Sequence, residues 1–209
     1  MPRLNPSPRA IGAIKAALFV IALLPLARLV AGAVAFPEWL GTNPAEYVTR
    51  SLGDWTLRFL LLTLAITPLR RLTGWNWLLR LRRMLGLFAF FYGAVHFTSY
   101  VAFDHVFAIE EILKDIVKRP FITVGVAALV LMVPLAATST NAMVRRLGAQ
   151  RWSALHRLVY PIAILGVVHF WMMVKRDVTE PAIYAVVLVA LLGYRVMAAR
   201  SGARQPGAA

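Results

Sequence analysis

Residues 84–103 read MLGLFAFFYGAVHFTSYVAF, twenty consecutive residues with no charged side chain and a single histidine, His96. An apolar run of about 20 residues can cross the hydrocarbon core of a bilayer as a helix. Similar runs flank this one, and together they predict six spans: about 11–36, 54–68, 84–103, 121–138, 155–174 and 181–199. The expected fold class is therefore an all-α integral membrane protein, a six-transmembrane-helix bundle.

The composition supports a membrane protein with one domain. Of 209 residues, 60% are hydrophobic and 15% are charged, and 23 Lys and Arg oppose 9 Asp and Glu. A basic balance in a soluble protein would suggest nucleic acid, but the apolar excess favours contact with membrane lipid instead. We expect a single transmembrane domain over residues 1–200 and a disordered tail over residues 201–209. Because the chain has no cysteine, it cannot form thiolate metal sites or Fe–S clusters.

The charges are divided unequally between the two faces of the predicted bundle. One face collects fifteen Lys and Arg and no acid, whereas the opposite loops hold all nine acids. Basic residues accumulate on the cytoplasmic side, so both termini are expected in the cytoplasm. A secretory signal ending near Ala33-Val34-Ala35 is the alternative for the first span, and its cleavage would not change the orientation of the others.

Two histidines are predicted to meet in the outward half of the bilayer. His96 lies twelve residues into the span that begins near Met84, and His169 lies fourteen residues into the parallel span that begins near Leu155. At about 1.5 Å per helical residue, these positions are roughly 18 and 21 Å across the membrane. Two imidazoles at one level could hold a haem iron from both sides, which suits electron transfer because no axial position stays open. A hydrogen-bonded core histidine is the alternative for either residue alone.

His156 is predicted near the cytoplasmic boundary, about 20 Å from His169 along the helix axis. It therefore cannot bind the same iron as His169. A second haem would need a partner about thirteen residues before His96, where residues 82–84 are Arg-Arg-Met. Three roles stay open for His156. It could bind a second haem together with an unusual ligand, donate a hydrogen bond to a quinone, or be an ordinary interfacial histidine. His105, at the outward end of its span, is interpreted as a solvated loop residue.

Two arginines lie within apolar runs. Arg28 is about 25 Å into the first span, and Arg58 is about 6 Å from the outward end of the second. Both depths match the level of His96 and His169. The functional interpretation is that they neutralise haem propionates, since the guanidinium group binds carboxylates with two parallel hydrogen bonds. The alternative is that both side chains extend to the membrane interface.

The chain has no G-x-G-x-x-G or Walker sequence for binding a nucleotide cofactor. Electrons would therefore come from a donor dissolved in the membrane or from another protein. A small transporter or channel lined by buried His and Arg is the rival function. An autonomous transmembrane ferric reductase would differ only in its electron acceptor.

Several segments together resemble a known family. They are Thr67–Arg71 (TPLRR), Arg82–Leu87 (RRMLGL) with Tyr92 and His96 beyond it, Lys118–Gly125 (KRPFITVG), and Leu147-Gly148 with Trp152, His156, Tyr160 and His169-Phe170 beyond it. Over roughly residues 10–200 the chain is similar to the haem-binding membrane subunits of bacterial periplasmic methionine sulfoxide reductase systems. This group lies within the ferric-reductase-like transmembrane superfamily.

The resemblance implies a multi-pass protein of the bacterial inner membrane that carries b-type haem. The resemblance implies that His96, His169 and His156 are the haem ligands. One haem is expected, and a second is left open. It also implies electrons from the quinol pool, with FMN or a cytosolic flavin reductase as further participants. The electrons would pass to a periplasmic molybdopterin-containing subunit, and that partner, not this chain, would reduce methionine sulfoxide. The superfamily usually has two histidines on each ligand helix, and residues 82–84 depart from that pattern.

Overall fold

The computed structural model describes residues 6–203. Its elements are helices, nine α-helices and three short 3-10 helices (η) in the described part of the chain: α1 Pro8–Val34, η1 Pro37–Leu40, α2 Pro44–Thr73, η2 Asn76–Leu78, α3 Leu79–His105, α4 Ile109–Lys118, α5 Pro120–Ala137, α6 Asn141–Leu147, α7 Ala149–Leu155, η3 His156–Leu158, α8 Val159–Met173 and α9 Thr179–Ala203.

Among residues 6–203, six helical segments are long and apolar enough to cross a membrane, which confirms the predicted fold class. The second is much longer than residues 54–68, because α2 has 30 residues. The side chain of Asn43 caps its first turn by accepting a hydrogen bond from the Glu46 N–H, and Pro44 occupies the first helical position. At the other end, Gly74 has φ +75°, a left-handed conformation that ends the helix at little steric cost.

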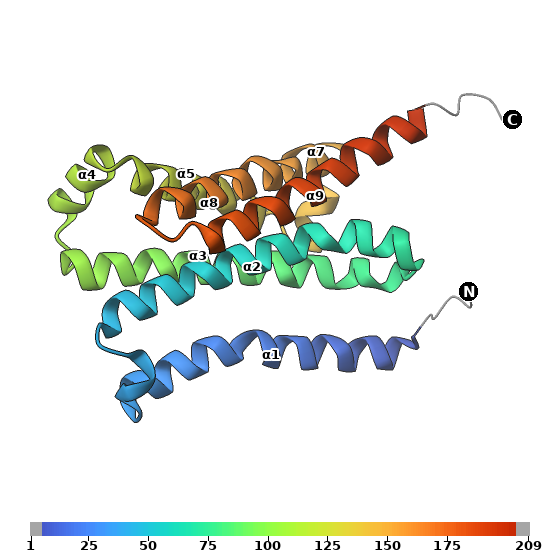
Figure 1. Cartoon of the computed structure of the whole chain (residues 1–209). Coiled ribbons are helices and arrows are strands. Elements are labelled where there is room, and N and C mark those ends of the chain that lie inside the picture. Colours follow the sequence, from blue (N-terminus) through green and yellow to red (C-terminus); the bar gives the residue numbers. More distant parts are fainter. Residues whose placement is uncertain (1–5, 204–209) are drawn as a thin grey trace, which may run out of the picture.

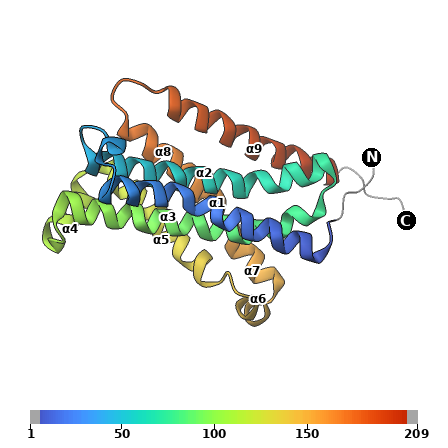
Figure 2. The same cartoon turned by 90° about the horizontal axis from the view of Figure 1, so that it is seen from below.

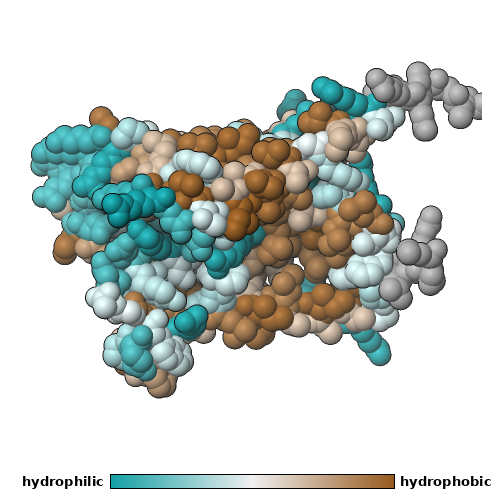
Figure 3. All heavy atoms as spheres, viewed as in Figure 1, coloured by the Kyte–Doolittle hydropathy of each residue, from teal (hydrophilic) through white to brown (hydrophobic). Residues whose placement is uncertain are grey.

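The spans form a bundle in which α2 packs most extensively on α3, and α5 on α8 (Figures 1 and 2). α9 lies against α2 and α8. The beginning of α1 and the end of α9 lie at one end of the bundle, and α4 lies at the other (Figure 1). An apolar band lies between two more polar ends of the molecule (Figure 3), the surface expected of a protein surrounded by lipid.

α1 lies at the edge of the bundle and is held there by Tyr92 of α3. The Tyr92 side chain is fully buried. Its hydroxyl donates to the carbonyl of Ala22 at 2.7 Å and accepts from the N–H of Leu26 at 3.3 Å. Pro25 lies between these two residues and interrupts the hydrogen bonding of α1, so the tyrosine satisfies backbone groups where the helix is weakest.

Three elements differ from the sequence expectation. The segment between the third and fourth spans contains the helix α4 and is not an open loop. The fifth span is interrupted at η3, which carries His156. α9 continues to Ala203, so the first residues of the predicted tail are helical, and the rest of that tail lies outside the described residues.

Candidate functional site

A cavity of about 530 Å³ lies among α2, α3, α5 and α8. Pockets of roughly 300–1,000 Å³ are the usual size for cofactors and small ligands. Its inner wall is mainly apolar and includes Leu57, Leu129, Met132, Ile162 and Phe170. The cavity can therefore hold a large apolar group in the half of the bundle nearer α4.

His96 and His169 both line this cavity, as the depth calculation predicted. Their ring centroids are 6.2 Å apart, and the ring planes are inclined at 74°. An imidazole nitrogen lies about 2 Å from a metal that it binds. Two imidazoles opposed across one metal would therefore have centroids roughly 6 Å apart. The separation fits two axial ligands of a single iron.

A backbone carbonyl fixes each ring from behind. The Nδ1 atom of His96 lies 2.8 Å from the carbonyl oxygen of Thr49 in α2. The Nδ1 atom of His169 lies 2.7 Å from the carbonyl oxygen of Phe121 in α5. Since a carbonyl can only accept, Nδ1 carries the proton and Nε2 keeps its lone pair. Neither Nε2 atom has a hydrogen-bond partner among residues 6–203, so both are available as ligands.

Two glycines let the rings lie against neighbouring helices. A Cβ atom on Gly125 of α5 would lie 2.9 Å from both Cε1 and Nδ1 of His169. A Cβ atom on Gly53 of α2 would lie 3.1 Å from Cε1 of His96. These glycines are needed for close approach, and the sequence alone did not identify them because no spacing rule links them to the histidines.

The opening of the cavity, at the α4 end of the bundle, is charged. We call its six charged lining residues the rim: Arg50, Asp54, Asp104, Arg119, Asp177 and Glu180. Hydrogen bonds from Thr179 keep the pKa of Asp177 below its usual value. Among the described residues that line the cavity, the two rim arginines are the Lys or Arg side chains, and the sequence interpretation missed both.

The two arginines predicted to hold propionates do not line the cavity. Arg28 is exposed on α1, at the edge of the bundle. The Nε of Arg58 donates to the hydroxyl of Tyr184 at 2.9 Å, and its guanidinium lies 4.8 Å from the ring centre of Trp55. The prediction used only the position of each arginine along its span and did not consider which face of the helix it occupies. On α2 the cavity side carries Arg50, Gly53, Leu57 and Leu60, and Arg58 lies beside that face.

His156 does not line the cavity, in agreement with the prediction that it cannot share an iron with His169. Its ring stacks on Trp152 with centroids 3.8 Å apart, and Nδ1 lies 3.0 Å from the carbonyl oxygen of Trp152. The Nε2 atom is buried and has no hydrogen-bond partner in the described part of the chain. A free, buried nitrogen is compatible with a ligand role, but no second histidine opposes it.

Comparison with known proteins supports the resemblance. The family described as "Ferric reductase like transmembrane component" matches residues 52–167, a range that includes His96 and His156 and ends just before His169. A relative named "Protein-methionine-sulfoxide reductase heme-binding subunit MsrQ" from Herminiimonas arsenicoxydans is 57% identical over 94% of this chain and 90% of the relative. The chain belongs to the MsrQ family. Proteins of the same printed name from Ralstonia nicotianae and Rhodospirillum rubrum are 54% and 56% identical, over 98% and 88% of this chain and 94% and 87% of their own lengths.

The printed name describes these relatives as haem-binding subunits of a protein-methionine-sulfoxide reductase. The word "subunit" in that name describes those relatives as one part of a larger reductase. The site fits the haem in that name, since the inner wall of the cavity is apolar, its volume is about 530 Å³, and two imidazole rings line it with centroids 6.2 Å apart.

Proposed function

We propose that this chain holds one b-type haem between His96 and His169 and serves as the membrane electron-transfer subunit of the reductase. The observation that carries the proposal is the 6.2 Å separation of two imidazoles whose Nδ1 atoms are both bound to backbone carbonyls. When bound, a haem with two imidazole ligands carries one electron at a time and offers no open position to substrate.

The protein contributes orientation and a dry environment. The carbonyls of Thr49 and Phe121 keep the rings in one tautomer and increase the basicity of the ligating nitrogens. Apolar residues on the inner wall keep water from the site, while the charged rim faces outward. The chain itself has no role in reducing methionine sulfoxide under this proposal.

The direction of electron flow follows from the charge asymmetry. The basic face, with both termini, is cytoplasmic, and the acidic face with α4 is periplasmic, in the bacterial inner membrane. Electrons come from the quinol pool, and the acceptor is a periplasmic molybdopterin-containing catalytic subunit. FMN and a cytosolic flavin reductase belong to the same proposal as further participants in electron supply. His156, with its free Nε2, is the third haem-related residue and the ligand for a second haem if one binds.

The test is a two-step electron transfer with the purified chain. Adding a reduced quinol analogue should convert the haem to its ferrous spectrum, and adding the candidate molybdoenzyme with methionine sulfoxide should restore the ferric spectrum. His96→Ala should prevent both steps. Reoxidation by ferric citrate but not by the molybdoenzyme would favour an autonomous ferric reductase. A folded but colourless preparation that takes up no added haem would favour a transporter.

A further inference from the structure

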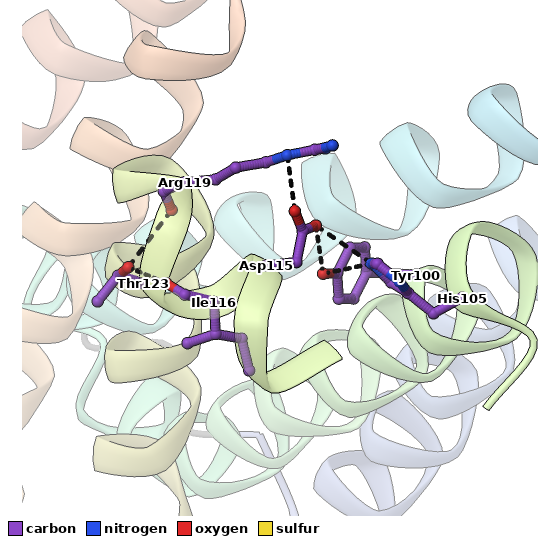
Figure 4. Close-up of polar contacts among 6 residues, drawn as sticks. All are labelled: Tyr100, His105, Asp115, Ile116, Arg119 and Thr123. Carbon is purple, nitrogen blue, oxygen red and sulfur yellow. Dashed lines mark hydrogen bonds and ion pairs between the residues drawn. The ribbon is translucent and has the colours of Figure 1, made fainter. Parts of the chain in front are cut away.

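A cluster of four polar side chains joins α4 to the outward end of α3 (Figure 4). The hydroxyl of Tyr100 donates to Oδ2 of Asp115 at 2.9 Å. The Nε2 atom of His105 lies 2.8 Å from that hydroxyl and 3.1 Å from the same carboxylate oxygen. The other carboxylate oxygen of Asp115 forms an ion pair with Nε of Arg119 at 2.7 Å. His105 is therefore not the solvated loop residue that the sequence suggested, since its side chain is only 12% exposed.

Backbone contacts also fix the position of Arg119. Its N–H bonds to the carbonyl of Asp115 at 2.9 Å, and the Thr123 hydroxyl of α5 donates to the carbonyls of Ile116 and Arg119 (Figure 4). The junction between α4 and α5 is thereby tied to both helices. The side chain of Arg119 begins from a fixed point, and Asp115 holds its Nε.

The remaining donors of Arg119 lie at the border of the cavity, on a side chain that is 58% exposed. Tyr100 and Arg119 are both cavity-lining residues, so the cluster borders the space between the histidines and the outer surface. Arginine has five N–H donors, and Asp115 engages only the one on Nε. The two terminal nitrogens have no hydrogen-bond partner among residues 6–203, and Figure 4 shows the end of the side chain reaching beyond Asp115. Arg50, the other rim cation, already pairs through a terminal nitrogen with Glu46 at 2.8 Å.

The charges on the rim make this arginine important. Four of the six rim residues are acids, so the opening would repel a carboxylate unless a cation were held in place. A haem carries two carboxylates, and an apolar inner wall leaves them only the rim. Paired N–H groups of a guanidinium match a carboxylate in geometry and charge.

We infer that the terminal nitrogens of Arg119 bind a propionate carboxylate of the haem, and that Asp115, itself fixed by Tyr100 and His105, is the positioning residue for Arg119. The inference rests on the proposed function, because it requires a haem in this cavity. It assigns the carboxylate site to the junction of α4 and α5 and not to Arg28 or Arg58.

The test compares two forms of the cofactor. One is haem, which has two free carboxylates, and the other is haem dimethyl ester, in which both carboxylates are esterified and uncharged. The apoprotein is titrated with each, and the ratio of the two dissociation constants is measured. The wild type should prefer haem, and Arg119→Gln should reduce that preference roughly tenfold, since one charge-assisted, bidentate contact is lost. Lys118→Gln is the matched control, because it removes the same charge from the neighbouring exposed residue, which does not line the cavity. It should keep the wild-type preference.

The positioning role has its own readout. Asp115→Asn should reduce the preference in the wild-type background but should have no further effect when Arg119 is already Gln. Merely structural damage weakens both ligands equally and leaves the ratio unchanged. If Arg119→Gln retains the wild-type preference, the inference is overturned. If Arg119→Gln binds neither ligand, the same titration is made with Arg119→Lys. A preference of this variant for haem supports the carboxylate contact. Equal affinity for haem and its dimethyl ester refutes that contact. A wild type that binds no haem refutes the proposed function itself, which is a distinct result.

Discussion

Gly125→Ala tests whether His169 must lie where the structure places it. The added methyl carbon would be 2.9 Å from Cε1 and Nδ1 of His169, about 0.5 Å short of ordinary van der Waals contact. The ring cannot withdraw freely, because its Nδ1 is bound to the Phe121 carbonyl at 2.7 Å. Overpacking of this kind costs about 1–3 kcal/mol, and the lost hydrogen bond about 1 kcal/mol more. Replacing glycine by alanine inside a helix stabilises the helix by only about 1 kcal/mol, which is less than these two losses together.

The displaced ring should weaken haem binding more than it weakens the fold. Changing groups that orient a metal-binding histidine typically lowers metal affinity by about 10–100-fold, and we expect a loss of that size for haem. Haem titration of the purified apoprotein measures the affinity, and the absorption spectrum reports the fraction of six-coordinate low-spin iron. Size-exclusion chromatography in detergent shows whether the variant is folded.

Two related variants give graded controls. Gly193→Ala makes the same exchange in α9, where nothing lies within 4 Å of the new methyl group, and should bind haem like the wild type. Gly53→Ala, whose new methyl group would lie 3.1 Å from His96, should have a haem affinity between those of Gly193→Ala and Gly125→Ala. Wild-type affinity and spectrum in Gly125→Ala would refute the claim that His169 is held as a ligand in its described position.

Three further substitutions test separate parts of the account. Tyr92→Phe removes a buried hydroxyl that bonds to α1 and should lower the free energy of unfolding by about 1–2 kcal/mol, measured by thermal unfolding in detergent. The same change at the half-exposed Tyr47 should have little effect, and equal losses at both sites would contradict the anchoring role of Tyr92. His156→Ala should keep the low-spin signal of the haem held by His96 and His169, since His156 does not line the cavity, and loss of that signal would contradict this placement. Arg58→Gln should leave haem affinity unchanged, because its Nε bonds to Tyr184 outside the cavity, and a tenfold loss would restore Arg58 as a carboxylate ligand.

The sequence predicted the fold class and the histidine pair for a simple physical reason. A helix rises by a constant distance per residue, so the position of His96 and His169 along their spans fixed their levels. The two spans run in the same direction, and their rings are found 6.2 Å apart. The bounds of α2 were harder to predict, because its ends carry charged residues that do not resemble a membrane span.

The rim and the supporting contacts could not be predicted in the same way. Depth along the axis says nothing about which face of a helix points to the cavity, so Arg28 and Arg58 were chosen over Arg50 and Arg119. α4 was interpreted as a charged loop, although Ile109, Ile112 and Ile116 recur at helical spacing. The carbonyls of Thr49 and Phe121 belong to the backbone and leave no mark on the sequence.

The most direct test of the central claim is the low-spin haem spectrum of three histidine variants made side by side. We expect His96→Ala and His169→Ala each to abolish the six-coordinate low-spin signal, and His105→Ala, in the cluster at the end of α3, to retain it. If either of the first two variants keeps a wild-type signal, these histidines do not share an iron, and the electron-transfer proposal loses its structural basis.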